Sequence, residues 1–237
     1  MDFTGGSGMN RTYRWLRRSV WAALLVVIAL GCNPLATIAF LTHRDVPVAA
    51  RYPLFPKEGP KRDKVVVAIF VNPGVGLGYE FAGAEDVLAS ELAKKMPEMA
   101  KENKKNLEVV PPAKVNEFKR KNPNWKNGMS PIAWGKALGA DYVLDIHLMK
   151  MSLFQPGSQN QLYEGRAEVH VFLYDVHSGG APEHYVHPFA FPRTGFRDAT
   201  SIPVGAFRKA FLERLAVEIA QYHLDYRAGS GIAESRW

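Results

Sequence analysis

Cysteine is nearly absent from this chain, since Cys32 is the only one among 237 residues. An internal disulfide is therefore excluded, and the fold must be stabilised by packing. Beyond Cys32 the chain can build neither a thiol active site nor a thiolate metal site. The sequence also lacks an H-E-x-x-H metal motif. Its glycine-rich stretch, 74–78, is not a nucleotide-binding motif, because Tyr79 replaces the third glycine and no Gly-Lys-Ser/Thr follows.

A strong charge of one sign is also missing from most of the chain. The net charge is +7, but residues 1–31 hold four arginines and one aspartate, which leaves 26 basic and 22 acidic residues, or +4, in the remainder. The densest basic stretch, 94–121, is interrupted by acids and is interpreted as a solvated helix face. We therefore expect no nucleic-acid partner, although a modest attraction to anionic headgroups or acidic wall polymers is compatible with it.

The first 32 residues have the layout of a secretory signal peptide. Four arginines between Arg11 and Arg18 precede an apolar run, 19–31, and Cys32 follows directly. A cysteine at this place, after Gly31, resembles the lipobox of bacterial lipoproteins, where the thiol is acylated and the peptide is cut before it. The resemblance implies a mature chain that begins at Cys32 and is held to a membrane by lipid such as palmitate.

Two alternatives to lipidation stay open. The chain has no charge from Val20 to Leu41, and these 22 residues are long enough for an uncleaved membrane anchor, although Pro34 disfavours a regular helix there. Ala29 and Leu30 also depart from the usual lipobox. The third alternative is cleavage and soluble export. Both anchored forms keep the arginines in the cytoplasm and place the rest in the periplasm or at the cell exterior.

The remainder is predicted to be a tether, one domain and a short tail. Residues 32–63 are proline-rich and weakly patterned, which favours an extended tether, and 229–237 are predicted to be disordered. Between them, 64–228 is predicted to be an α/β domain whose first strand, 64–72, is apolar throughout and thus buried on both faces. The expected strands and helices are, in order, strand 64–72, helix 83–102, strand 107–110, helices 113–121 and 130–138, strands 141–154, 161–176 and 184–191, and helix 204–226.

This order predicts a single mixed-sheet domain with flanking helices and a long antiparallel hairpin. In the hairpin, residues 163–173 alternate apolar and polar, which is typical of an antiparallel strand with one solvated face. Ser130 and Pro131 favour a helix start, and Gly139 favours a left-handed helix end. Residues 122–128 are predicted to be loop, and the glycines of 74–78 to be a loop that tolerates substitution.

The stretches 137–143, which read Ala-Leu-Gly-Ala-Asp-Tyr-Val, and 165–176 resemble a motif of known envelope proteins. The order of elements is similar to the domain shared by the TolB amino-terminal region, the curli-secretion lipoproteins and the lipoprotein activators of penicillin-binding proteins. The resemblance implies a module that binds partners or assembles in the envelope, not an enzyme. Gly31 to Pro34 and the run Phe118 to Trp125 also resemble a set of planctomycete envelope lipoproteins.

Few residues suggest chemistry. Asp175, His177 and Ser178 have the residue types of a hydrolytic triad, but adjacency in sequence is not triad geometry. His177, His184 and His187 lack the spacing of a metal site, so no metal and no cofactor are expected. Three aromatics near the predicted loop and the hairpin tip, namely Trp125, Phe154 and Tyr163, are candidates for a partner-binding surface. Packing in the core is the alternative for Trp125.

The sequence therefore predicts a membrane-anchored envelope lipoprotein, attached through Cys32, that acts as a non-enzymatic binding or assembly module. Its partner would be an envelope protein or a glycan. The first alternative is an uncleaved single-pass inner-membrane protein with the same external domain, and the second is an envelope hydrolase.

Overall fold

The computed structural model describes residues 46–56, 63–74 and 76–227. The chain divides into two compact units, and the larger one contains residues 47–226 with the main sheet. The predicted signal sequence, the lipid-attachment residue Cys32, the anchor to residue 41 and the tail 229–237 lie outside the described residues. None of the helices placed between residues 46 and 227 is both long and apolar enough to cross a bilayer.

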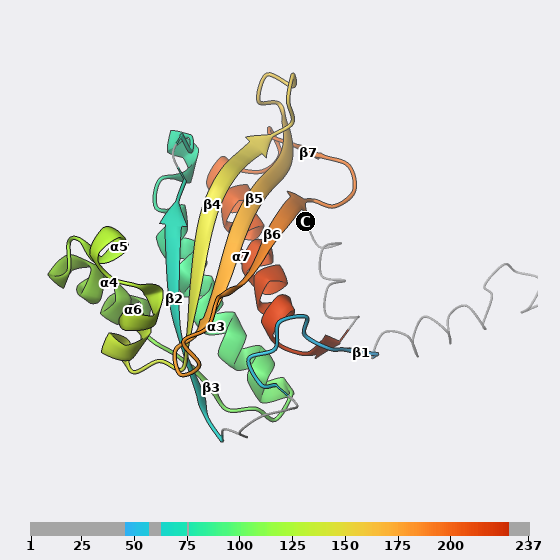
Figure 1. Cartoon of the computed structure of the whole chain (residues 1–237). Helices are drawn as coiled ribbons and strands as arrows, with labels where there is room; N and C mark the ends of the chain where they lie inside the picture. Colours follow the sequence, from blue (N-terminus) through green and yellow to red (C-terminus); the bar gives the residue numbers. More distant parts are fainter. Residues whose placement is uncertain (1–45, 57–62, 75, 228–237) are drawn as a thin grey trace, which may run out of the picture. The chain divides into compact units, whose positions relative to one another are not determined.

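The described residues form eight strands and six helical segments, most of which are labelled in Figure 1. In chain order they are β1 (Pro47–Val48), β2 (Val65–Pro73), the 3₁₀ turn η1 (Tyr79–Phe81), α3 (Ala84–Glu102), β3 (Leu107–Val109), α4 (Pro112–Lys121), α5 (Trp125–Gly128), α6 (Pro131–Leu138), β4 (Tyr142–Phe154), β5 (Leu162–Asp175), β6 (Glu183–Phe191), β7 (Arg197–Asp198), α7 (Val204–His223) and β8 (Tyr226–Arg227).

The main sheet is mixed and has the strand order β3-β2-β4-β5-β6, with β7 paired to one end of β5. Strand β2 runs parallel to β3 and β4, whereas β4, β5 and β6 form an antiparallel meander. A second, two-stranded sheet joins β1 and β8. The predicted α/β fold, with one mixed sheet, flanking helices and a long hairpin, is confirmed.

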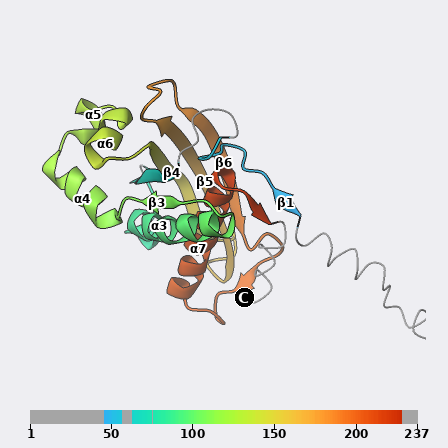
Figure 2. The ribbon, with the colours of Figure 1, turned by 90° about the horizontal axis from the view of Figure 1, so that it is seen from below.

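The helices cover the two faces of the sheet unequally. Because β3 and β4 lie on opposite sides of β2, the crossover from β2 to β3 and the crossover from β3 to β4 run across the sheet in opposite directions, and right-handed crossovers then put their helices on opposite faces. Accordingly α3 lies with α7 on one face and α4, α5 and α6 on the other, as the view from below shows (Figure 2). The second group of helices stands over β2 and the start of β4 and leaves β5 and β6 uncovered on that face (Figure 1).

Two hydrophobic clusters match the two faces. The larger lies between the sheet and the α3–α7 pair, and the smaller lies under α4, α5 and α6 around Phe70. Strand β2 contributes to both, with Val67 and Ile69 in one and Ala68 and Phe70 in the other, which is why its sequence is apolar without alternation. In β5 the residues at odd positions from 163 to 173 are buried and the intervening ones are not, as the alternation predicts.

Several local predictions are confirmed and others are wrong. Ser130 caps α6 by accepting from Ala133 N, and Gly139 ends it at φ 67°. The predicted helix 83–102 is confirmed as α3, which continues through Pro97 to Glu102, whereas the predicted loop 122–128 contains the short helix α5. The buried positions of α6 are Trp134 and Gly135, and Ile132 and Leu138 pack beside them, partly buried.

The glycine-rich loop is also less tolerant than expected at one position. A Cβ at Gly74 would lie 2.2 Å from the carbonyl oxygen of Leu148, so the backbones of the loop and of β4 approach too closely for a side chain. Gly76, by contrast, has open space around it and a φ of +86°. The need for glycine at position 74 comes from this contact and not from phosphate binding.

Part of the predicted tether packs on the domain. Tyr52 N donates to Tyr222 O at 2.8 Å, and Leu54 N donates to His223 O at 3.1 Å, at the end of α7. The side chain of Leu54 is 1% exposed and joins the larger cluster. The prolines of 32–63 thus do not keep all of that stretch apart from the domain.

Candidate binding site

The sheet has a topological switch point between β2 and β4, because the crossover from β2 leads to β3 on one side and the crossover from β3 returns past β2 to β4 on the other. In open α/β sheets such points leave a crevice between diverging helices, and ligands bind there. Three polar residues lie at this place: Asn72 near the end of β2, and Asp145 and His147 on the same face of β4.

Asp145 is a buried carboxyl group, 5% exposed, within an otherwise apolar strand. Asn72, also buried, donates its Nδ2 proton to Asp145 Oδ1 at 2.7 Å. The other carboxylate oxygen lies 2.9 Å from His147 Nε2. Both oxygens are therefore satisfied, as a buried carboxylate requires, and the half-exposed imidazole connects the buried group to the surface.

Lys119 of α4 borders this cluster from the helical side. Its ammonium donates to Val71 O at 3.4 Å and lies 5.5 Å from the ring centre of Phe70 and 5.2 Å from that of Trp125. Burial and the neighbouring charge of Lys126 lower the pKa of Lys119, while the charges of Asp86 and Asp145 oppose that shift. A partly desolvated cation next to a buried carboxylate gives the switch point both signs of charge.

From the switch point two rows of residues cross the uncovered strands. Asp145 is paired with Phe172 of β5, which is paired with His184 of β6, and in the next row Asn72, His147, His170 and Val186 are successive partners. We call His147, His170, Phe172, His184 and Val186 the open sheet face. Their rings contact one another. The rings of His147 and Phe172 meet edge-on with their centres 5.5 Å apart, and the rings of Phe172 and His184 stack with their centres 4.3 Å apart.

The open sheet face combines apolar and titratable groups on a rigid support. Val186 is 46% exposed, although it stands on a strand and not in a loop. Imidazoles can donate or accept hydrogen bonds and change charge near neutral pH. Within the described part of the chain, no group of three histidine, aspartate or glutamate side chains is arranged to hold a metal ion. The face offers aromatic rings for stacking and imidazole nitrogens for hydrogen bonding.

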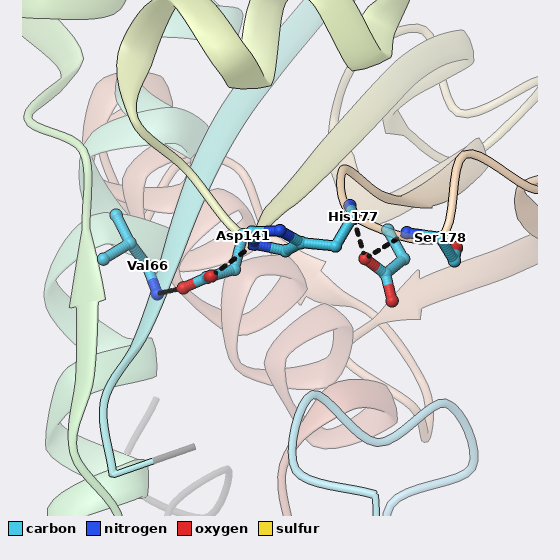
Figure 3. A network of polar contacts seen from close by, with 5 residues as sticks. Val66, Asp141, His177 and Ser178 are labelled. Carbon is cyan, nitrogen blue, oxygen red and sulfur yellow. Dashed lines mark hydrogen bonds and ion pairs between the residues drawn. The ribbon is translucent and has the colours of Figure 1, made fainter. Parts of the chain in front are cut away.

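A second polar network lies at the opposite end of β4, and Figure 3 shows it from close by. Asp141 accepts from Val66 N at 2.8 Å with one oxygen, and its other oxygen lies 2.8 Å from His177 Nε2. Asp175 Oδ1 accepts from the backbone nitrogens of His177 and Ser178. The ring of His177 is directed at Asp141, with Ser178 on its other side (Figure 3).

This network does not bring the three triad residue types into triad geometry. Ser178 Oγ lies 3.5 Å from the backbone nitrogen of Gly180, from which it accepts, and is not among the partners of His177. Asp175 holds the turn after β5 through backbone bonds, as an Asx turn does. The arrangement ties the start of β2, the start of β4 and the end of β5 together.

The aromatics that the sequence singled out do not form one surface. Trp125 is 7% exposed, and its ring centre lies 5.3 Å from that of Phe70 and 4.6 Å from that of Trp134. Tyr163 is 2% exposed, stacks on Phe207 and donates its hydroxyl proton to Ile202 O at 3.0 Å. Only Phe154 is half-buried, and it stacks on Tyr163. Trp125 and Tyr163 both fill core positions, and for Trp125 this is the alternative that the sequence left open.

A sequence signal for the switch point exists, although it does not single out the site by itself. Asn72 and Asp145 are polar residues within apolar strand patterns, and buried polar residues of that kind need partners. Their pairing follows from the register of β2 with β4, which neither strand reveals alone.

No protein-family model matches this chain, and no curated protein matches it. Among solved structures, the PelC dodecamer from Paraburkholderia phytofirmans is similar at 11% identity, over 76% of this chain and 97% of that chain, with a TM-score of 0.40. Lipoprotein GNA1162 from Neisseria meningitidis is similar at 14% identity, over 64% and 98%, with a TM-score of 0.37. The LpoB C-terminal domain from Escherichia coli is similar at 17% identity, over 53% and 82%, with a TM-score of 0.32.

Proposed function

We propose that this chain is a membrane-anchored envelope lipoprotein that acts as a non-enzymatic binding or assembly module, with the open sheet face as its binding surface. The observation that carries the binding part is the face of β4, β5 and β6 that the described helices leave open beyond the start of β4, where Phe172, His184 and Val186 are presented on paired strands. An apolar side chain as exposed as Val186 on a rigid sheet is suited to contact a partner.

The anchoring part rests on the sequence before the domain. The arginines from Arg11 to Arg18, the apolar run 19–31 and Cys32 support acylation at Cys32 and exposure of the domain to the periplasm or the cell exterior. The partner on this proposal is an envelope protein or an envelope glycan. The uncleaved single-pass anchor is the alternative.

Two measurements test the two parts separately. For the anchor, cells are labelled with a fatty-acid probe, and wild type is compared with Cys32→Ser. Label on wild type only, with Cys32 as the first residue of the mature chain by mass spectrometry, is the expected result. An unlabelled wild-type chain that retains residues 19–31 would support the uncleaved alternative.

For the binding surface, a photo-crosslinking residue is placed at Val186 and, as the control, at Lys101 on α3, an exposed position on the other side of the sheet. Crosslinking in intact envelopes should give a discrete product at 186 that is absent at 101 and is lost when Phe172→Ser is added. A protein adduct identifies a protein partner, and an adduct removed by glycan digestion identifies a glycan. Identical patterns at both positions would contradict the assignment of the surface.

A further inference from the structure

A pocket of about 680 Å³ opens between β6, α7 and the segment 48–51, away from the open sheet face. Its volume is in the range of small-molecule sites. The residues that line it are Val48, Ala49, Arg51, His187, Pro188, Ala190, Arg193, Glu218, Gln221, Tyr222 and Tyr226. Arginine, imidazole, amide and tyrosine groups therefore converge on one concave site.

His187 is the unusual member of this lining. It is 5% exposed, and neither of its buried ring nitrogens makes a hydrogen bond within the described part of the chain. The nearest charged atom is Glu218 Oε2, 3.4 Å from Nε2, a contact without hydrogen-bond geometry. Buried polar groups in folded proteins almost always have partners, so an imidazole whose one polar contact among the described residues is this long one to Glu218 indicates a group still to be supplied.

Glu218 does not make the pocket acidic. Its Oε1 atom accepts hydrogen bonds from Arg193 Nη2 at 2.7 Å and from Arg214 Nε at 3.3 Å. Burial alone would raise the pKa of Glu218, but the contacts with His187, Arg193 and Arg214 outweigh burial and hold the pKa below its ordinary value. The carboxylate is thus ionised and already compensated by two cations.

Arg51 supplies positive charge at the mouth of the pocket. Its segment is fixed on both sides, since Ala50 N donates to Asp225 Oδ1 at 2.8 Å and Tyr52 N donates to Tyr222 O at 2.8 Å. The guanidinium lies 5.5 Å from the ring centre of Tyr52 and makes no ion pair with any of the described carboxylates. An arginine on a backbone segment held in this way is suited to bind a carboxylate.

We propose that this pocket binds an acidic saccharide, with the sugar carboxylate on Arg51 and ring hydroxyls on His187 and Gln221. A hydroxyl group both donates and accepts, so it satisfies the imidazole in either tautomer, which a bare anion cannot do. The rings of Tyr222 and Tyr226 offer aromatic surface to the C–H face of the sugar. The proposal does not use the open sheet face, so it can fail or hold independently of the function proposed above.

The test uses the full chain in detergent and methyl β-D-glucuronide as the probe, with methyl β-D-glucoside as the neutral counterpart. Calorimetry and saturation-transfer NMR should detect the glucuronide and give at least tenfold weaker binding of the glucoside. Arg51→Gln should remove that preference without changing the melting temperature. Arg120→Gln, a charge removal on the exposed side of α4, is the matched control and should bind as wild type does.

A second measurement reports on His187 directly. In ¹⁵N-histidine spectra, one pair of ring-nitrogen signals should shift on adding the glucuronide, and that pair should be missing in His187→Gln. If His187→Gln does not fold, Arg51→Gln still decides the matter by affinity. Equal binding of the two glycosides, no binding at millimolar concentration, or full affinity in Arg51→Gln would each overturn the proposal.

Discussion

The hydroxyl oxygen of Tyr185 lies 3.0 Å from Nε2 of His223, in the interior of the domain. The other ring nitrogen of His223, Nδ1, lies 3.0 Å from the carbonyl oxygen of Tyr52. Since a carbonyl only accepts, Nδ1 carries the proton, and Nε2 accepts from Tyr185. The neutral imidazole thereby joins β6, α7 and the segment that enters the domain.

We expect the burial of His223 to make the stability of the domain depend on pH. Burial, opposed by the bond to Tyr52, lowers the pKa of His223 from 6.5 to about 4. The unfolded chain therefore binds a proton between those values that the folded chain does not, and the unfolding free energy falls as pH drops from 6.5 toward 4. The loss is on the order of 3 kcal/mol and is measured by urea titration at several pH values.

The control for this prediction is the difference between wild type and His223→Gln. Other groups titrate in both chains, so the difference isolates His223. It should shrink steadily as the pH is lowered through that window. Parallel pH curves for wild type and His223→Gln would show that His223 is not the group responsible.

Gly165→Ala should destabilise the domain although it adds a single methyl group. A Cβ at Gly165 would lie 2.4 Å from Cδ2 of Phe211, which is fully buried in the core. Overpacking of this kind costs about 1–3 kcal/mol. Gly180→Ala, in the turn after β5, is the control, because the nearest atom to its Cβ is 3.8 Å away. Equal melting temperatures for the two variants would contradict the close packing of β5 on α7.

Trp125→Ala should behave as a core truncation and not as the loss of a surface contact. We expect an unfolding free energy about 3–5 kcal/mol lower, because Trp125 packs on Phe70 and Trp134. Trp134→Phe should cost less, on the order of 1 kcal/mol for the bond from Trp134 Nε1 to Trp125 O, at 3.1 Å. A Trp125→Ala chain as stable as wild type would restore the interpretation of Trp125 as an exposed aromatic.

Leu54→Ala tests where the folded unit begins. The sequence assigns residue 54 to a tether, whereas the structure buries Leu54 against the larger cluster. Truncation of a buried leucine should cost about 2–5 kcal/mol, while Val46→Ala, at a side chain 45% exposed, should cost little. Thermal melts of the two variants decide between a docked segment and a tether.

The sequence predicts the strands and helices well where the pattern is local. The alternation in β5, the cap at Ser130 and the left-handed Gly139 each follow from a few neighbouring residues. The mixed sheet follows from the order of apolar runs. These features were predictable because hydrophobic period and capping chemistry act over a few residues.

The candidate sites were not predictable in the same way. The meeting of Asn72 with Asp145 depends on strand register, and the meeting of His187 with Glu218 depends on how α7 crosses β6. Likewise, the prolines of 32–63 suggest an extended tether, but Tyr52 and Leu54 bond to the end of α7 across about 170 residues of chain. Long-range packing of this kind has no local signature.

The bond between Ala50 N and Asp225 Oδ1 joins residues 175 positions apart, at the two ends of the folded unit. Its beginning and its end are therefore adjacent, as they are in domains that tolerate insertion into other proteins. Such a unit could be transplanted into an exposed loop of a host protein without stretching either junction. Joining its ends and cutting the hairpin turn 155–160 instead would give a circular permutant whose sheet order is unchanged.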